Sequence, residues 1–327
     1  MVSVMDLPGA IQALERGLMA EAQGHATNMV KTHVEWDGST LHAIGAAFPH
    51  EGFVGTKTWA HTEGGATPLL ILFDSHDGSL KAVIEAFALG QMRTASASGV
   101  ATKWLAAEDS TEFGMIGTGK QALAQVAAVV AVRPIRRIRI FGRNRERLET
   151  FAERVRQEFG IPVLAASSIA EACNGAHIVT VATRATQPII TSAMLSPGAH
   201  VNTIGAIVPS RAELTADVLA RASKIVADSV PQARKLSREL IEFLGDVSAA
   251  WERVESLASV VAKQERRSPA QDLTIFKALG MGISDLALGV EIYRQAVASE
   301  IGHAFSHPKK VAPRLRSSPI QNQTTGA

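Results

Sequence analysis

The sequence is poor in residues that mark several protein classes. Among its 327 residues are one cysteine and one tyrosine, and aromatic residues make up only 5%. The single Cys173 cannot form an internal disulfide, and with only His177 nearby a zinc site would lack two ligands. These shortages exclude a disulfide-stabilised secreted domain. Six of the ten histidines are spread through the first 76 residues without ligand spacing, so we expect no bound metal.

Long apolar runs and a strong charge of one sign are also absent. The longest apolar run, 126–132, is far shorter than the roughly 20 residues that cross a bilayer. Asp6 and Glu15 interrupt the region where a signal peptide would be apolar. Lys plus Arg number 33 and Asp plus Glu 31, a balance that argues against a protein that neutralises phosphates along a nucleic acid. We therefore expect a cytoplasmic protein with neither membrane nor nucleic-acid partners.

Small apolar residues dominate what is present, and their pattern changes near residue 110. Before it, one helix over about 7–23 precedes several short strands, which predicts an α+β unit. After it, strands alternate with helices, as in the βαβ units of a parallel sheet. The fold class is therefore α/β, with a Rossmann-type doubly wound parallel sheet plus an α+β domain. The segment 236–299 is predicted to be helical, with a break around Ser268.

A glycine-rich turn is the sharpest local motif. Residues 113–125 read FGMIGTGKQALAQ, in which Gly117, Gly119 and Ala122 form G-x-G-x-x-A between an apolar strand and a helix. In this context the glycines permit a tight turn and close approach of a pyrophosphate, and the helix N-terminus supplies amide donors. A dinucleotide site is therefore predicted. Its expected contacts are Gly117, Thr118, Gly119, Lys120, Gln121, Ala122, Ala182 and Thr183.

The end of the second strand of this unit indicates which dinucleotide binds. NAD sites place an acid there for the ribose hydroxyls, whereas NADP sites place cations for the 2′-phosphate. This chain has Arg143, Asn144 and Arg145, with no acid before Glu146. A guanidinium binds phosphate bidentately, so the prediction is NADPH rather than NADH. The alternative is that these arginines merely solvate the start of a helix.

Five motifs together carry a resemblance to a known family. In order they are VGTKTW, LGQMRTASASGVATKWLA, GMIGTGKQA, NTIGAIVPSRAEL and DLTIFKALGMGISDLALG. This combination resembles the ornithine cyclodeaminase/mu-crystallin family, which includes cyclodeaminases, ketimine and imino-acid reductases and amino-acid dehydrogenases. The resemblance implies a homodimer.

The resemblance also implies how the chain is divided. Residues 1–110, rejoined by about 282–302, would form an α+β substrate-binding and dimerisation domain. Residues 111–281 would form the Rossmann domain, which presents the nicotinamide to a pocket between the domains. The basic, proline-containing segment 303–327 is predicted to be a disordered tail.

Several family site residues can be carried over by motif. Lys57 matches the lysine that reaches the substrate nitrogen or carbonyl oxygen, and is expected to be catalytic. Arg93 matches the arginine that pairs with the substrate carboxylate. Lys31 falls where many members have a second carboxylate-binding arginine, so the charge is kept without the planar fork. His61 is a further substrate-contact candidate, and Gly280 would lie beside the nicotinamide. The alternative, that Lys57 and Arg93 are surface charges, disagrees with their small-residue, apolar surroundings.

One departure from the family pattern bears on the reaction. Where cyclodeaminases and related alanine dehydrogenases carry an aspartate implicated in handling the amino group, this chain has Ile207. Isoleucine can neither accept a proton nor pair with an ammonium, which argues against cyclodeamination by that route. Ile207 is expected to line the substrate pocket. Asp228 matches a position common in the family, for which we expect a structural or ribose-side role.

Three functions follow from these residues. The leading hypothesis is an NADPH-dependent reductase of a C=N bond adjacent to a carboxylate, in a cyclic ketimine or imino acid, with amino-acid dehydrogenation as the reverse reaction. The second is an ornithine cyclodeaminase that uses NAD. The third is a non-catalytic protein that binds a small ligand in an NADPH-dependent way.

Overall fold

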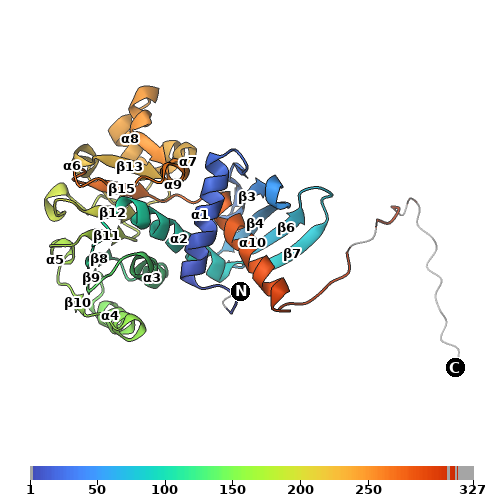
Figure 1. Cartoon of the computed structure of the whole chain (residues 1–327), viewed down its shortest axis with the longest axis horizontal. Coiled ribbons are helices and arrows are strands. Elements are labelled where there is room, and N and C mark those ends of the chain that lie inside the picture. The colour runs from blue at the N-terminus through green and yellow to red at the C-terminus, as the bar shows by residue number, and fades with distance from the viewer. Residues whose placement is uncertain (1–2, 308–309, 314, 316–327) are drawn as a thin grey trace.

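The computed structural model describes residues 3–307, 310–313 and 315, which build two sheets with helices between and around them (Figure 1). The first sheet is antiparallel, in the order β1-β3-β4-β6-β7, with β2 added to β3 and β5 to β4. Its strands are β1 (Thr27–Asn28), β2 (Thr32–Trp36), β3 (Ser39–Phe48), β4 (Phe53–Thr62), β5 (Gly65–Ala66), β6 (Leu69–Asp74) and β7 (Leu80–Glu85).

The second sheet is entirely parallel and has the order β10-β9-β8-β11-β12-β15-β13-β14. The chain winds outward in one direction from β8 through β9 to β10, and in the other from β11, so the strand order reverses between β8 and β11. The predicted doubly wound fold is confirmed. The strands are β8 (Glu112–Ile116), β9 (Arg137–Phe141), β10 (Val163–Ala165), β11 (Ile178–Val181), β12 (His200–Thr203), β13 (Lys224–Ala227), β14 (Val254–Ser256) and β15 (Thr274–Lys277).

Helices connect these strands and join the two sheets. The α-helices are α1 (Leu7–Ala22), α2 (Phe87–Leu105), α3 (Ala122–Val132), α4 (Arg145–Phe159), α5 (Ile169–Cys173), α6 (Ala216–Arg221), α7 (Val230–Leu236), α8 (Arg238–Leu244), α9 (Leu257–Lys263) and α10 (Gly282–Ala298). Short 3-10 turns are η1 (Pro49–Glu51), η2 (Ser192–Met194) and η3 (Ser248–Arg253). None of these helices is long and apolar enough to cross a membrane.

The prediction that 236–299 is helical was wrong at two places. β14 and β15 lie within it, and β15 is paired on both sides, with β12 and β13. All four residues of β15 are buried, so the strand lacks the alternation that distinguishes a strand from a buried helix. The segment just before Gly280 is therefore a sheet strand, and a tight turn at Gly280 follows it.

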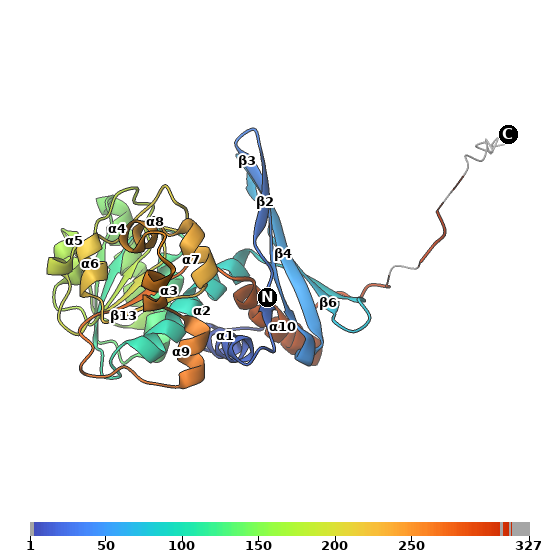
Figure 2. The ribbon, with the colours of Figure 1, turned by 90° about the horizontal axis from the view of Figure 1, so that it is seen from above.

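Helix α10 returns the chain to the first sheet. It contacts α1, α2, β3, β4 and β6, and Figure 2 shows α1 and α10 between the antiparallel sheet and the parallel-sheet half. The contact with β3 is so close that a Cβ on Gly282 would come within 1.7 Å of the Gly45 carbonyl oxygen. We propose domain boundaries near 110, between α2 and β8, and at 281. The tail predicted over 303–327 lies largely outside the described residues.

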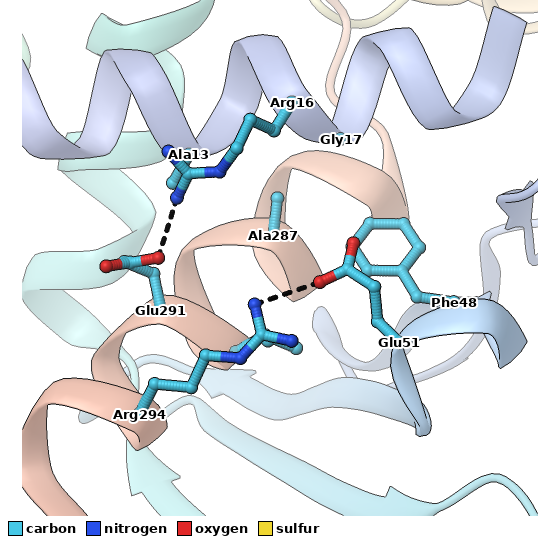
Figure 3. A pocket seen from close by; sticks show the side chains of 9 residues that line it. Ala13, Arg16, Gly17, Phe48, Glu51, Ala287, Glu291 and Arg294 are labelled. Atoms are coloured by element: carbon cyan, nitrogen blue, oxygen red, sulfur yellow. Dashed lines mark hydrogen bonds and ion pairs between the residues drawn. The ribbon is translucent and has the colours of Figure 1, made fainter. Parts of the chain in front are cut away.

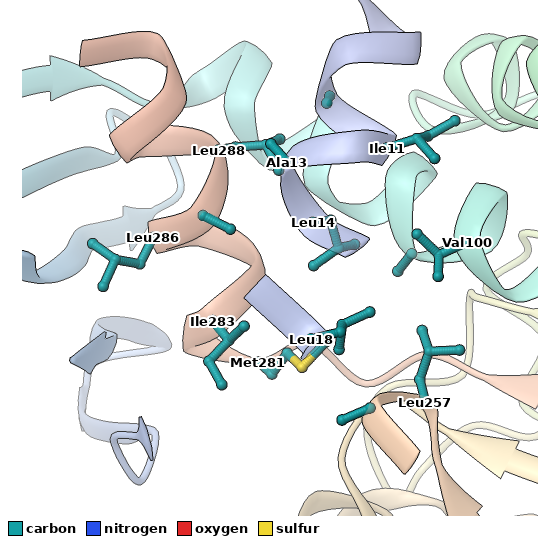
Figure 4. Close-up of a cluster of buried hydrophobic side chains, with 14 of the residues drawn as sticks. Ile11, Ala13, Leu14, Leu18, Val100, Leu257, Met281, Ile283, Leu286 and Leu288 are labelled. Carbon is teal, nitrogen blue, oxygen red and sulfur yellow. The ribbon is translucent and has the colours of Figure 1, made fainter. Parts of the chain in front are cut away.

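A shared hydrophobic core holds α10 against both halves of the molecule. Figure 4 shows Leu14 and Leu18 of α1 close to Val100 of α2, Leu257 of α9 and Ile283 of α10, all buried. Burial of aliphatic side chains of this size stabilises a fold by roughly 1.5–3 kcal/mol each. The first turn of α10 is thus held firmly at the junction where the site residues meet.

Candidate active site

The predicted cofactor residues lie at the carboxyl edge of the parallel sheet, where the strand order reverses. Gly117 follows β8 with a φ of +110°. A Cβ there would come within 2.5 Å of the carbonyl oxygen of Ala182, which follows the neighbouring strand β11. Gly117 therefore has to be glycine for two reasons, its backbone conformation and its contact with the adjacent loop.

Among the described residues, no side chain caps the start of α3. Gln121 is at the N-cap position, but its side chain makes no capping hydrogen bond, and its buried Oε1 has no partner among the described residues. A Cβ on Gly119 would meet no other described residue within 4 Å, so the turn is open at this point. An open turn at an uncapped helix N-terminus fits the pyrophosphate of a dinucleotide.

The predicted phosphate-binding arginines lie beside this turn. Gly142 follows β9, and a Cβ there would be 2.8 Å from Cγ2 of Thr118. Arg143 comes next and is exposed, and Asn144 caps α4 by accepting a hydrogen bond from the Arg147 amide at 2.8 Å. Arg145 is exposed and forms an ion pair with Glu149 one turn further along α4. Arg143 is thus the better placed of the two cations for a 2′-phosphate.

A buried ion pair lies at the centre of the predicted substrate-binding residues of the first domain. Lys57 on β4 is only 4% exposed, and its Nζ lies 2.5 Å from Oδ1 of Asp285 in the first turn of α10. Burial lowers the pKa of the Lys57 ammonium. The Asp285 carboxylate opposes this effect, whereas the charges of Arg93 and Lys31 add to it. The Lys57 proton is therefore held less tightly than in an ordinary lysine, as suits a proton donor.

Arg93 joins this pair from α2. Its Nε lies 3.6 Å from the same Asp285 Oδ1 and is buried without a hydrogen-bond partner among the described residues. On its other side, a Cβ on Gly280 would come within 2.9 Å of Arg93 Nη1. Lys31 lies between β1 and β2, and burial, followed by the charge of Arg93, lowers its pKa. Three predicted substrate residues, Lys31, Lys57 and Arg93, are thus brought together around Asp285.

Asp228 connects this cluster to the parallel sheet. It follows β13, and its buried carboxylate accepts hydrogen bonds from the amides of Leu279, at 2.9 Å, and Gly280, at 2.7 Å. Burial raises the pKa of Asp228, and the two amides and the charge of Arg93 oppose this rise. These contacts fix the turn between β15 and α10, which is a structural role.

An aromatic strip continues from Lys57 along the inner face of the antiparallel sheet. Lys57, Trp59 and His61 alternate on β4, and His42 on β3 pairs directly with Trp59. The rings of His42 and Trp59 stack with centroids 4.8 Å apart, and Lys57 Nζ lies 5.2 Å from the Trp59 ring centroid. His61 therefore shares a face with Lys57, as its proposed substrate contact requires. The sequence analysis did not single out Trp59 or His42.

The buried carboxylate of Glu213 holds the loop that carries Ile207 in place. Glu213 accepts hydrogen bonds from the amide of Thr183 at 2.8 Å, the hydroxyl of Thr203 at 2.8 Å and the amide of Gly205 at 2.9 Å. It therefore ties the loops after β11 and β12 together. Ile207 itself is 39% exposed. Its side chain is accessible at the same edge as the predicted cofactor residues.

Asp285 is the main site residue that the sequence analysis missed. The signal was present, because an acid within ISDLALG sits in an otherwise apolar helical stretch, and a buried carboxylate requires a partner. Without the register of β4 against α10, however, that partner could not be identified.

A separate pocket between α1, η1 and α10 is not a substrate site. Ion pairs Arg16–Glu291, at 2.7 Å, and Glu51–Arg294, at 3.0 Å, span it (Figure 3). Its volume of about 10 Å³ is no more than one water molecule needs.

Comparison with known proteins finds similarity along almost the whole chain. The model of the ornithine cyclodeaminase/mu-crystallin family matches residues 3–300. Delta(1)-pyrroline-2-carboxylate reductase of Bacillus cereus is 30% identical over 239 residues, which cover 72% of this chain and 73% of that protein.

Solved structures show the same fold. The Delta(1)-pyrroline-2-carboxylate reductase of Thermococcus litoralis, in complex with NADH and L-proline, is 26% identical with a TM-score of 0.85, covering 92% of this chain and 97% of that chain. An archaeal alanine dehydrogenase dimer with bound NAD is 27% identical with a TM-score of 0.84, covering 94% and 96%.

Proposed function

This chain belongs to the ornithine cyclodeaminase/mu-crystallin family, and we propose that it is an NADPH-dependent reductase of a C=N bond adjacent to a carboxylate. The substrate class is a cyclic ketimine or imino acid, and the reverse reaction is amino-acid dehydrogenation. The observation that carries this proposal is the cluster of buried Lys57, buried Asp285 and half-buried Arg93 next to the carboxyl edge of the parallel sheet. It combines a titratable amine and a guanidinium at the crevice where such sheets bind ligands.

In this mechanism each cation has its own task. Arg93, with Lys31, binds the substrate carboxylate, since the guanidinium fork matches a carboxylate bidentately. Lys57 donates a hydrogen bond or a proton to the imine nitrogen, which makes the adjacent carbon more electrophilic. A bound nicotinamide supplies the hydride to that carbon. The balance is one hydride on carbon and one proton on nitrogen, which yields the amine.

The relatives support this substrate class. The Bacillus cereus protein is a reductase of pyrroline-2-carboxylate, and the Thermococcus litoralis structure holds L-proline. Both names describe a cyclic nitrogen compound that carries a carboxylate. The cyclodeaminase alternative is weakened by Ile207, because an isoleucine cannot bind the side-chain ammonium of ornithine.

The choice of NADPH rests on Arg143 and its surroundings. The two solved relatives hold NADH and NAD, which supports a nicotinamide cofactor in this chain. Arg143 is exposed beside the glycine-rich turn, and a cation there favours the additional phosphate of NADPH.

We also propose that the chain forms a homodimer through the outer face of the antiparallel sheet, the face away from α10. The large apolar side chains exposed there are Val34, Trp36, Leu41, Leu69 and Val83. A group of exposed large apolar side chains on one face of a sheet is typical of an interaction surface. The archaeal alanine dehydrogenase, whose structural match covers 94% of this chain, is a dimer.

A spectrophotometric assay tests the proposed reaction. NADPH and NADH oxidation would be followed with cyclic imino acids, and separately with keto acids plus ammonia or methylamine. We expect turnover with NADPH and cyclic imino acids, lost in Lys57→Ala and Arg93→Ala variants that keep the wild-type circular dichroism spectrum. Proline formation from ornithine without net NADPH consumption would instead establish a cyclodeaminase. Tight NADPH binding without turnover of any substrate would establish a binding protein.

A further inference from the structure

We propose that Asp285 is a positioning residue that holds Lys57 Nζ at the substrate nitrogen and keeps it in the ammonium form. Asp285 touches neither the substrate nor the reacting atoms in this proposal. It acts through Lys57, and the proposal therefore rests on the reductase function proposed above.

The geometry of the pair is the first support. Both side chains are buried, with Asp285 1% exposed, and Nζ and Oδ1 are 2.5 Å apart. Lys57 is fixed in the middle of β4, between β3 and β6. The first turn of α10 is fixed against β3 by the close contact of Gly282 with Gly45. Two rigid elements thus set the position of the amine, so Lys57 has little rotational freedom left to lose when a substrate binds.

The charges around Lys57 are the second support. Arg93 faces it from α2 and Lys31 from the segment between β1 and β2, and both disfavour a further positive charge. Burial has the same effect and is the larger influence on the Lys57 pKa. Asp285 is the group that opposes all three, by its charge and by its hydrogen bond.

Asp285 is directed mainly at Lys57 rather than shared evenly with Arg93. Oδ1 is 2.5 Å from Lys57 Nζ but 3.6 Å from Arg93 Nε, beyond an ordinary hydrogen bond. Arg93 Nε is left without a partner among the described residues. This division leaves the guanidinium free for a carboxylate while the lysine is held in place.

Loss of the Asp285 carboxylate should therefore change the pH dependence of kcat in a specific way. In Asp285→Asn, Lys57 loses its proton at lower pH, so the alkaline limb of the kcat profile moves to lower pH. At pH 8 we expect kcat to fall by about tenfold or more, since a well-placed general acid contributes on the order of 100-fold or more. The KM for the imino acid should change much less, because Arg93 and Lys31 remain.

The decisive measurement follows Lys57 itself and needs no turnover. In protein labelled with ¹³Cε-lysine, the Lys57 NMR signal is identified by its loss in Lys57→Arg and titrated with pH. We expect the titration midpoint of Lys57 to drop in Asp285→Asn and to recover in Asp285→Glu. Glu291→Gln is the matched control, because it makes the same change on α10 in a side chain paired with Arg16. It should leave both the midpoint and kcat unchanged.

The outcomes separate the two proposals. An unchanged Lys57 midpoint in folded Asp285→Asn, or an effect on KM alone, would overturn the role of Asp285. If Asp285→Asn does not fold, Asp285→Ser removes the same charge with a smaller side chain and is judged by the same criteria. A wild-type protein inactive on every imine would refute the reductase proposal, while the NMR titration would still decide whether Asp285 maintains the Lys57 ammonium.

Discussion

Gly280 lies directly against the guanidinium of Arg93, so the turn between β15 and α10 forms one wall of the proposed carboxylate site. A Cβ on this residue would come within 2.9 Å of Arg93 Nη1. The φ of Gly280 is +92°, a backbone conformation that other residues adopt only with strain. Helix α2 and the turn before α10, which are far apart in the sequence, therefore meet at these two residues.

We expect Gly280→Ala to raise the KM for the imino acid by about tenfold or more, equivalent to at least about 1.4 kcal/mol of lost binding. The added methyl group displaces the guanidinium, and the strained backbone loosens the turn that Asp228 holds. Steady-state kinetics on the folded variant would measure this. Gly78→Ala is the control, since Gly78 has a φ of +72° and a Cβ there would meet nothing within 4 Å in the part of the chain that the structure describes. A KM increase of the same size in both variants would contradict the contact with Arg93.

Arg143 gives a second prediction, on cofactor choice. Arg143→Ala should raise the Kd of NADPH by about tenfold or more and change that of NADH by less than about threefold, because only NADPH carries the 2′-phosphate. Nucleotide fluorescence titration measures both constants. Arg147→Ala, which removes another exposed arginine further along α4, should affect neither. An equal loss of affinity for both cofactors would refute this role of Arg143.

Local signals in the sequence predicted much of the fold. The glycine-rich turn and the alternation of strands and helices after residue 110 are short-range features, and the structure contains them. β15 escaped prediction because a strand of four buried residues has no periodicity of its own. Its identity depends on neighbours β12 and β13, which lie far away in the sequence.

The candidate site likewise has residues that local motifs predict and residues that only the tertiary fold identifies. Lys57 and Arg93 stand in recognisable motifs, and the structure places them around one carboxylate. The partner Asp285 is 228 residues from Lys57, and only the packing of α10 on the antiparallel sheet brings it there. Likewise, Glu213 accepts hydrogen bonds from backbone amides of two separate loops, and no spacing in the sequence predicts these contacts.

Glu21, at the end of α1, should make stability depend on pH. Burial raises its pKa from 4.5 to about 7, the charge of Asp228 adds to this, and a hydrogen bond from Asn28 opposes it. A pKa that is higher in the folded state means that folding loses stability as the pH rises from about 4.5 to 7.

Glu21→Gln removes this penalty and keeps an acceptor for Asn28. We expect the variant to be more stable than wild type by about 2 kcal/mol at pH 8, with a much smaller difference at pH 5. Urea unfolding at the two pH values measures both differences. The exposed Glu252→Gln should show no such dependence. A variant that is less stable than wild type at pH 8 would show that the Glu21 carboxylate has a partner that stabilises its charge.

The outer face of the antiparallel sheet gives the last prediction. Val34 on β2 and Leu41 on β3 are paired directly across the strands, and both are exposed. Placing lysine at both positions sets two like charges side by side on the proposed interface, and burying them there would cost several kcal/mol. We expect wild type to have twice the mass of one chain by light scattering, and Val34→Lys with Leu41→Lys to have the mass of one. Val247→Lys, at an exposed apolar residue of the parallel-sheet half, should remain a dimer. A single-chain mass for wild type would refute the dimer, and an intact dimer in the double variant would place the interface elsewhere.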